Sequence, residues 1–251
     1  MKVVTWNVNG IRAREAQVLE LLDRESPDLV CLQEIKAPSS KVPASLRALP
    51  GYFGAWHGES AYSGVALLVR RERVPAPPTL IHPPFDFETR AVAAEVGGVT
   101  VACLYVPNGG KDFDAKLRFL TALDAWAAQA EAAGRQLLLC GDLNVTATEA
   151  DVHVKERRAD AIGQRDGERA LLSSVVGRGL VDVGRALDPA NNALFTWWPP
   201  WRGLRQKNVG WRIDYVMAAR SLAAKASRCR VLAEFGTSDH APVVSEFEGW
   251  G

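Results

Sequence analysis

The sequence is poor in cysteine and histidine, which limits the chemistry it can support. It has four histidines and four cysteines, namely Cys31, Cys103, Cys140 and Cys229. The cysteines have neither CxxC spacing nor a histidine neighbour, so they predict no zinc site. Three of them lie in the apolar runs LVCLQE, VACLYV and LLLCGD, which is typical of buried strand residues in a reducing compartment. A redox function is the less favoured alternative.

The sequence also lacks long hydrophobic segments and a strong charge of one sign. No run approaches the roughly 20 apolar residues of a membrane span, and the start, MKVVTWNVNG, lacks the long apolar region of a signal peptide. We therefore expect a soluble, cytoplasmic protein with no membrane partner. The formal net charge of +1 argues against a uniformly basic coat, so any attraction to phosphate must come from local clusters.

The chain is long enough to bury a sizeable core. It has 251 residues, of which 47% are hydrophobic, and no repeat or low-complexity tract separates its parts. These properties predict one domain over residues 1–251. The sequence does not specify an oligomeric state, and a monomer is the default expectation.

Short strand-like runs alternate with a few helical segments. Hydrophobic spacing and end signals predict helices over 12–25, 112–134 and 167–178. The predicted strands are 2–6, 28–32, 52–57, 64–70, 90–96, 99–106, 137–140, 194–198, 211–218, 229–233 and 242–247. The charged segment 147–166 is predicted to be a long surface loop. Hairpins mixed with helical connections favour an α/β fold of two packed sheets with helices outside.

Polar phrases interrupt the apolar runs at residues 7–9, 33–34, 141–144, 212–214 and 236–242. Together they predict one oxygen-rich, metal-assisted site. Glu34 would lie at the exposed end of its strand, where a carboxylate suits Mg²⁺ because that ion prefers oxygen ligands. Asn7 could orient a metal ligand or a phosphate. Taken singly, Glu34 also fits an ordinary solvated glutamate, and Asn7 and Asn9 fit turn residues.

The phrase GDLN places two polar side chains two residues apart. Because alternate side chains of extended backbone face the same way, Asp142 could accept a proton from water while Asn144 holds that water or the phosphate. An Asx-turn that ends a strand is the structural alternative.

A carboxylate and an imidazole near the end of the sequence are a second candidate pair. Alternation in WRIDYVM places Asp214 on one face with Val216, and a carboxylate within a strand needs a partner. His240 is the obvious candidate, because a bound carboxylate fixes the imidazole tautomer and favours its charged form. A charged imidazole aimed at phosphate would stabilise a negative transition state. A structural histidine that holds a loop is the alternative.

Seven phrases in this order resemble the exonuclease III family of abasic-site endonucleases. They are TWNVNGIRAR, LQEIK, YSGVALL, YVPNGG, GDLN, NVGWRIDY and TSDHAPV, and they span residues 5–243. Single phrases such as GDLN are shared with a wider superfamily that includes deoxyribonuclease I, sphingomyelinases and inositol-polyphosphate phosphatases. The combination with NVGWRIDY is far more specific.

The resemblance implies a fold and an activity. The fold is a four-layered α/β sandwich of the deoxyribonuclease I type, with two mixed sheets face to face and helices outside. The activity is hydrolysis of duplex DNA on the 5′ side of abasic sites with Mg²⁺, or alternatively Mn²⁺, together with 3′-phosphodiesterase or 3′-to-5′ exonuclease activity on blocked 3′ ends. The balance among these activities is not predicted.

The resemblance also implies roles for individual residues. Glu34 would hold the metal with Asn7 beside it, and Asp239 would organise that region. Asp142 would orient or deprotonate the attacking water, although a metal-bound hydroxide is the alternative nucleophile. The remaining expected site residues are Asn144 beside this water, Asp214 and His240 near the scissile phosphate, and Tyr105 and Asn108 on phosphate oxygens. Some family members carry aspartate where this chain has Asn9, so the resemblance does not establish a second metal ligand there and leaves the number of metals, one or two, open.

DNA recognition is expected in residues 197–212, where aromatic side chains alternate with cations. The resemblance places Trp197, Trp201 and Trp211 around a pocket for the extruded abasic sugar, and Trp198 fits either the pocket or the core. The WWPPW spelling departs from other members and leaves the damage preference open. Expected phosphate contacts elsewhere are Arg12, Lys36 and Lys111, for which a solvated surface role is the alternative.

Two other function classes are carried as alternatives. A phosphodiesterase or phosphatase acting on lipid or inositol phosphates would show a membrane-facing apolar loop or a strongly basic small pocket, whereas this chain mixes aromatic and basic residues. A non-catalytic DNA-binding relative would have lost site residues, whereas every expected acid, amide and imidazole is present.

Overall fold

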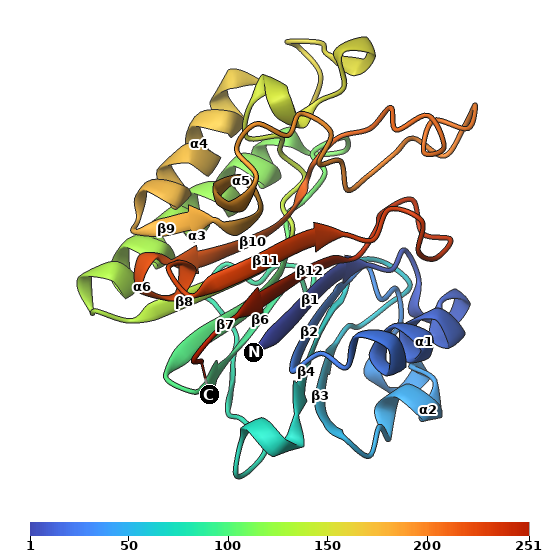
Figure 1. The fold of residues 1–251 in the computed structure, drawn as a ribbon, viewed down its shortest axis with the longest axis vertical. Coiled ribbons are helices and arrows are strands. Elements are labelled where there is room, and N and C mark those ends of the chain that lie inside the picture. The colour runs from blue at the N-terminus through green and yellow to red at the C-terminus, as the bar shows by residue number, and fades with distance from the viewer. Residues whose placement is uncertain (251) are drawn as a thin grey trace.

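The computed structural model describes residues 1–250, which form two mixed six-stranded sheets (Figure 1). The first sheet has the order β11-β12-β1-β2-β4-β3 and the second the order β5-β6-β7-β8-β10-β9. Strands of the first are β1 Lys2–Asn7, β2 Leu29–Gln33, β3 Tyr52–His57, β4 Val65–Arg70, β11 Ala226–Val231 and β12 Val243–Phe247. Strands of the second are β5 Leu80–Ile81, β6 Ala91–Val96, β7 Val99–Tyr105, β8 Gln136–Asp142, β9 Leu180–Asp182 and β10 Asp214–Ala219.

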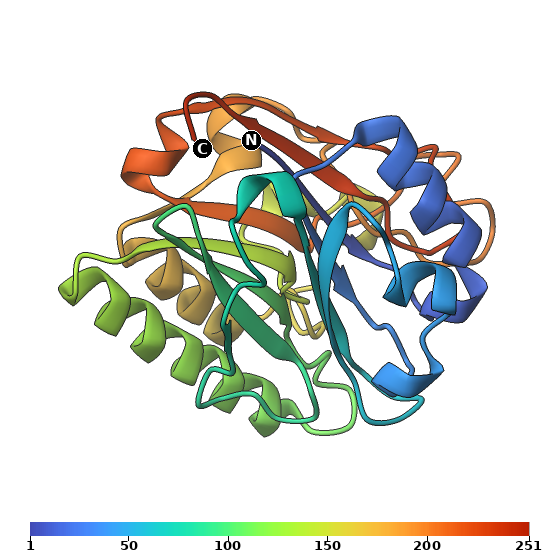
Figure 2. The same ribbon diagram turned by 90° about the horizontal axis from the view of Figure 1, so that it is seen from below.

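Helices cover the outer faces of both sheets (Figure 2). The outer face of the first sheet carries α1 Glu15–Glu25 and α2 Ala44–Arg47, and that of the second carries α3 Phe113–Ala132 and α4 Asp166–Gly177. The short helices α5 Val183–Leu187 and α6 Arg220–Ala223 follow β9 and β10. The predicted four-layered sandwich is confirmed.

Side-chain alternation along the strands builds the layers. In β2, Leu29 and Cys31 face the core between the sheets, while Val30 and Leu32 face the helices of the first sheet. The same two-residue period in β10 turns Val216 toward the inter-sheet core and the residues beside it toward the helices of the second sheet. Strands buried on both faces therefore read as continuous apolar runs.

The longest helix begins and ends at the signals found in the sequence. The side chain of Asp112 accepts a hydrogen bond from the backbone N–H of Ala115 at 2.8 Å and so caps α3. Gly134, just beyond the helix, has φ 65°, a left-handed conformation that costs glycine little. None of the helices in residues 1–250 is long and apolar enough to cross a membrane.

Several predicted elements differ from the structure: the helix predicted over 12–25 begins at Glu15, the strand predicted over 229–233 is β11 at Ala226–Val231, and two further differences lie next to the polar phrases. Residues 194–198 are not a strand: only Trp197 makes isolated bridges, to Trp211 and His240. Prolines 199 and 200 follow directly, and proline cannot donate to a ladder. The strand predicted over 211–218 begins at Asp214, so this carboxylate lies at a strand end rather than within the strand.

The segment 147–166 is more than a surface loop, because it contains a fully buried carboxylate. Asp151 accepts hydrogen bonds from Arg185 and Arg212, both at 2.7 Å. Burial alone would raise the pKa of Asp151, but the two guanidinium groups hold it below its ordinary value. This ion network ties the segment to the strand that carries Asp214.

We predict that Asp151→Asn lowers the free energy of unfolding by about 3 kcal/mol, because it removes the counter-charge of Arg185 and one of the two counter-charges of buried Arg212, which still pairs with Asp182. Since the folded pKa is lowered, the contribution of Asp151 is complete above its unfolded pKa of about 4 and is lost as pH falls through the folded value. Urea denaturation followed by circular dichroism at neutral and acidic pH measures both effects.

The matched control is Arg118→Gln, which breaks an ion pair between exposed side chains. It should leave the urea midpoint almost unchanged. An unchanged midpoint for Asp151→Asn as well would contradict a stabilising role of the network.

Candidate active site

The ends of several central strands meet at one rim of the sandwich. Strand register places them there: Asn7 pairs with Gln33 across β1 and β2, and Asp142 lies between Tyr105 of β7 and Asp214 of β10. The carboxyl ends of parallel strands reach the same edge, and β10 runs antiparallel, so its first residue arrives at that edge. The rim therefore gathers groups from sequence positions more than 200 residues apart.

Asn7 links the two sheets at this rim. Its fully buried amide donates to Glu34 Oε1 at 3.0 Å and to Asp142 Oδ2 at 2.9 Å. Tyr105 donates its hydroxyl to the same Glu34 oxygen at 2.8 Å. The two carboxylates predicted for metal binding and for proton transfer are thus held by one side chain.

Gly141 sets the spacing of β7 and β8 directly before Asp142. Its φ is 153°, and a Cβ built on it would lie 1.9 Å from the carbonyl oxygen of Leu104. No side chain fits there, so glycine lets the two backbones approach.

Asn144 is fixed on both sides of the GDLN turn. Its backbone N–H donates to Asp142 Oδ1 at 2.9 Å, and its side chain donates to the carbonyl of Val106 at 2.9 Å. The first bond is the Asx-turn considered as an alternative, and the same turn leaves Asn144 beside Asp142. Asn108 donates to Asn144 Oδ1 at 3.3 Å. The two predicted amides and the carboxylate therefore lie together.

Lys116, which the sequence analysis did not identify, supports this turn from below. Its buried ammonium donates to the backbone carbonyl of Asn144 at 2.7 Å and forms an ion pair with buried Glu168 of α4. The only sequence signal is a lysine at a position of α3 that faces the core.

His240 contacts Asp214 as expected. Its Nδ1–H donates to Asp214 Oδ2 at 2.9 Å, and its Nε2 lies 3.8 Å from Asp142 Oδ2. The backbone of His240 is fixed as well, because its carbonyl oxygen accepts a hydrogen bond from the indole N–H of Trp6 at 3.1 Å. The imidazole therefore lies between two buried carboxylates. Asp142 and Asp214 belong to the second sheet, whereas His240 precedes β12 of the first.

Burial and mutual charge shift the proton affinities of these groups. Burial raises the pKa of Asp142 to about 7; His240 opposes this shift and Asp214 adds to it. Burial would lower the pKa of His240, but Asp214 and Asp142 raise it to about 10. Burial also raises the pKa of Tyr105 above its ordinary range, so its hydroxyl stays a donor. The site holds a charged imidazole beside a carboxyl that can exchange a proton near neutral pH.

The Glu34 side of the site offers oxygen donors. Burial would raise the pKa of Glu34, but hydrogen bonds from Asn7 and Lys36 and the charge of Lys36 hold it below its ordinary value. The Lys36 ammonium lies 2.6 Å from Glu34 Oε2 and 2.6 Å from Asn9 Oδ1, so a cation already faces these oxygens. Lys36 is partly exposed and can withdraw toward solvent. Glu34 and the amides beside it therefore fit a hard divalent cation.

Asp239 borders the same region. It accepts from Asn9 at 2.8 Å and from the indole of Trp197 at 2.9 Å. Asn9 thus lies between Asp239 and Lys36. Asn9, Glu34 and Lys36 all have φ between 44° and 52°, a strained conformation for residues other than glycine. Strain of this kind is concentrated at functional sites.

Asp142, Asp214 and His240 form a second set of possible metal donors, with ligand atoms within 4.8 Å of one another. All three are buried, and a charged imidazole already lies between the two carboxylates, 2.9 Å from Asp214 and 3.8 Å from Asp142. A divalent cation placed there would have to displace that proton, whereas at Glu34 it meets a cation that can leave.

Of the predicted tryptophans, Trp197 lies beside the histidine and Trp211 packs against Trp197. Trp197 and Trp211 pack edge to face with centroids 5.4 Å apart, and the centroid of Trp197 lies 6.4 Å from that of His240. Trp201 is 57% exposed on a loop that lines a hollow next to Asn9 and Asp239. Trp198 is buried, which decides its two alternatives in favour of the core.

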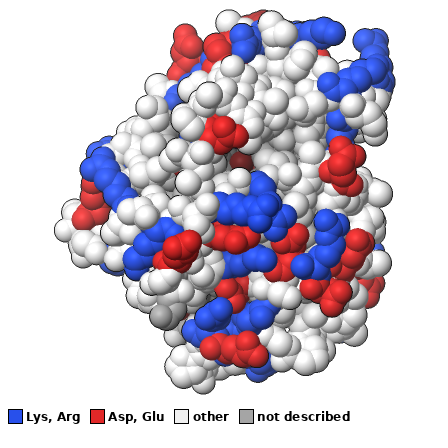
Figure 3. Space-filling view, viewed as in Figure 1, with Lys and Arg blue, Asp and Glu red and all other residues white. Residues whose placement is uncertain are grey.

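Two predicted phosphate contacts lie farther out. Lys111 lines a second hollow with Asn108, and its ammonium lies 5.4 Å from the ring centroid of Tyr62. Arg12 is exposed in the 3₁₀ helix Ile11–Ala13. Figure 3 shows basic and acidic side chains interspersed on one face rather than gathered into a basic surface, in keeping with the low net charge.

Comparisons with known proteins identify the family to which the chain belongs. The model of the Endonuclease/Exonuclease/phosphatase family matches residues 4–240. The exodeoxyribonuclease of Bacillus subtilis is 31% identical over 97% of this chain and 98% of its own length. Recombination repair protein 1 of Drosophila melanogaster is 29% identical over 98% of this chain, which spans only 37% of that longer protein.

Two solved structures are also similar. The 3′ phosphatase NExo from Neisseria, bound to a product DNA hairpin, has a TM-score of 0.90 and 32% identity, with 99% of each chain covered. An AP endonuclease from Archaeoglobus fulgidus has a TM-score of 0.87 and 28% identity, again with 99% of each chain covered. With its fold, its rim of strand ends and these relatives, the chain belongs to the Endonuclease/Exonuclease/phosphatase family, within its exonuclease III group.

Proposed function

We propose that this chain is a DNA-repair hydrolase that cleaves duplex DNA on the 5′ side of abasic sites. It would also remove blocked 3′ ends as a 3′-phosphodiesterase or 3′-to-5′ exonuclease. The observation that carries the proposal is the Asn7 amide, which holds the Glu34 and Asp142 carboxylates together beside a charged His240. The names of the relatives support it, since they include a 3′ phosphatase bound to DNA and an AP endonuclease.

The chemistry assigned to the site is in-line attack of water on phosphorus, in which a P–O bond forms to the water and the bond from phosphorus to the 3′ oxygen of the preceding nucleotide breaks. That oxygen leaves and takes a proton from solvent to become the 3′-hydroxyl. Asp142, with a pKa of about 7, takes the proton of the attacking water, and Asn144 beside it orients that water. The His240 imidazolium faces the negative charge that develops on the phosphate, and Asp214 keeps the ring charged. Asn108 would add a hydrogen bond to a phosphate oxygen, and Tyr105 would do so on turning its hydroxyl proton from Glu34 to the phosphate.

Glu34, with Asn7 and Asp239 beside it, would hold the metal, for which Mg²⁺ or Mn²⁺ is the natural class because the donors are oxygens. When bound, the cation neutralises charge on the phosphate. The tryptophans Trp197, Trp201 and Trp211 would cover the extruded abasic sugar, since extrusion is cheapest where no base remains to be unstacked. Arg12 and Lys111 would contact the DNA backbone.

We predict metal-dependent incision of a duplex that carries a single abasic analogue. Mg²⁺ should support incision, and EDTA should abolish it. Glu34→Gln keeps an oxygen that can accept from Asn7 and Tyr105 but removes the charge, so it should reduce incision toward the EDTA level. Gel electrophoresis of end-labelled DNA measures the product.

The control for this experiment is Glu20→Gln, which changes an exposed acid of α1. It should incise like the unaltered protein. Absence of metal-dependent incision by the unaltered protein would sink the proposed function.

We predict that Asp142→Asn lowers kcat about 10²- to 10⁴-fold while DNA affinity stays nearly the same, because the group that takes the proton of water is lost while the shape of the site is kept. In the unaltered protein, activity should fall as pH drops below about 7, where Asp142 is protonated, and as pH rises above about 10, where His240 loses its charge. The variant should lose the acidic limb of the profile. Single-turnover rates and fluorescence anisotropy separate catalysis from binding, and a large loss of affinity instead would count against this role.

We predict that Trp211→Ala weakens the preference for abasic over intact DNA by about tenfold, because an aromatic cover is lost from the pocket. Trp211→Phe keeps an aromatic face and should retain most of the preference. Competition binding with matched duplexes measures the ratio, and an unchanged ratio in the alanine variant would remove Trp211 from the pocket.

A further inference from the structure

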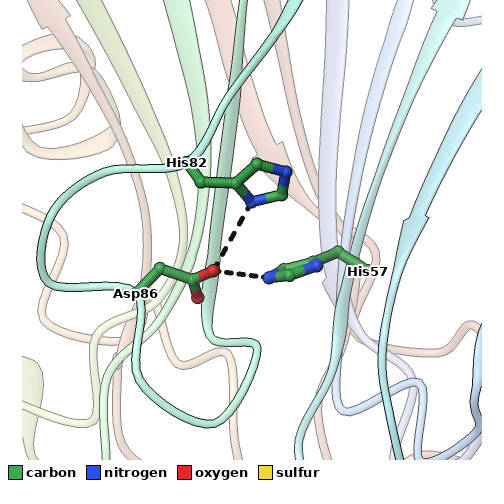
Figure 4. A group of neighbouring side chains, drawn as sticks. All are labelled: His57, His82 and Asp86. Atoms are coloured by element: carbon green, nitrogen blue, oxygen red, sulfur yellow. Dashed lines mark hydrogen bonds and ion pairs between the residues drawn. The ribbon is translucent and has the colours of Figure 1, made fainter.

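Three side chains of metal-ligating types converge at the sheet edges, at the same end of the sandwich as the rim described above but outside the groups that Asn7 holds: His57, His82 and Asp86 (Figure 4). His57 Nε2 lies 2.5 Å and His82 Nδ1 lies 3.5 Å from the same carboxylate oxygen, Asp86 Oδ2. The two rings have centroids 4.5 Å apart and are tilted by 55°. Two imidazole nitrogens and one carboxylate oxygen thus point toward a common centre, and they account for two of the four histidines of the chain.

The cluster joins the edges of the two sheets. His57 is the last residue of β3, the edge strand of the first sheet, and His82 directly follows β5, the edge strand of the second. Asp86 lies in the loop that leads on to β6. Side chains from both sheets therefore meet where neither sheet has a further strand to pair with.

Backbone hydrogen bonds fix the orientation of the Asp86 carboxylate. Its Oδ1 accepts the N–H groups of Arg90 and Ala91 at 2.8 and 2.9 Å, which leaves Oδ2 for the two histidines. The preceding Phe85 is buried against Phe119 and Trp126 of α3, with centroids 5.0 and 5.8 Å away. Hydrogen bonds of this kind to a ligating carboxylate are a regular feature of metal sites, because they orient the ligand.

Hydrogen bonds alone would satisfy these three side chains less completely than a bound metal ion would. The separation of 3.5 Å from His82 Nδ1 to Asp86 Oδ2 is at the outer limit of a hydrogen bond. In a tetrahedral site with metal–ligand bonds of about 2.0–2.1 Å, ligand atoms are about 3.3 Å apart. His82 already lies near that separation, and His57 would move outward by less than ~1 Å. His82 is half exposed, which leaves room for a water molecule as a further ligand.

The ligand types select the class of metal. Two imidazoles with one carboxylate suit first-row transition cations such as Zn²⁺, whereas Mg²⁺ prefers oxygen ligands alone. We propose that His57, His82 and Asp86 bind one divalent cation of the Zn²⁺ class and that this cation fastens the two sheet edges together. The site is separate from the oxygen donors around Glu34 and does not depend on the proposed function.

The test uses the full chain and Zn²⁺ alone as the probe, with excess Mg²⁺ present to compete at oxygen sites. Isothermal titration counts the bound Zn²⁺, and thermal unfolding measures the stabilisation. A cation that binds only the folded chain at about 100 times its Kd should raise Tm by about 5 °C or more. Two variants remove ligands: His82→Ala truncates a half-exposed side chain, and Asp86→Asn keeps an oxygen for the Arg90 and Ala91 N–H groups.

The matched control is His153→Ala, which removes a histidine outside the cluster and the rim. The proposal expects His82→Ala and Asp86→Asn to lose one equivalent of Zn²⁺ and the associated rise in Tm, while His153→Ala retains both. Each rise is measured against the same variant in EDTA, so a lower starting stability does not affect the comparison. Equal Zn²⁺ binding by all variants, or no rise in Tm of the unaltered chain, would overturn the proposal.

Discussion

The arrangement of the site depends on one buried amide, that of Asn7. Its two N–H groups reach Glu34, which follows a strand of the first sheet, and Asp142, which ends a strand of the second. A buried amide with unpaired N–H groups would be costly, so these bonds stabilise the fold and set the distance between the two carboxylates at once. The position of Glu34 relative to Asp142 is therefore a property of how the two sheets pack.

Charge compensation is the second constraint on this rim. Asp142 and Asp214 are both buried, and two ionised carboxylates so close would repel each other without a cation. His240 supplies that cation from the opposite sheet, and Lys116 with Glu168 supplies a second buried pair beneath the GDLN turn. The same side chains therefore contribute to the stability of the fold and to the electrostatic preorganisation of the site. The unfavourable free energy of burying their charges is confined to the groups assigned to the chemistry.

Much of this molecule follows from local sequence patterns, and the failures have a common physical cause. The period of two in β2, the Asp112 cap and the glycine beyond α3 each act within a few residues, and each predicts its element correctly. In β10 the same period assigns the two faces correctly, but the strand begins at Asp214 rather than at residue 211. The segment 194–198 resembles a strand in sequence because it is largely apolar, yet its conformation depends on residues that are distant in the sequence. Asp151 looks like a surface residue because its partner arginines lie 34 and 61 positions away. For the site, the polar phrases identify which side chains gather, but neither the double role of Asn7 nor the Lys116 support is visible before the strands are aligned.

The glycine at position 141 has a consequence for attempts to alter this protein. Backbone contact with Leu104 leaves no space for a side chain, so any replacement would separate β7 from β8 and shift Asp142 against Tyr105. A mutant library can keep Gly141 and vary the polar residues around it. Such a library tests new side chains on an unchanged backbone. In a library that also varies position 141, most variants would have a displaced backbone, and a loss of activity would then say nothing about the catalytic side chains.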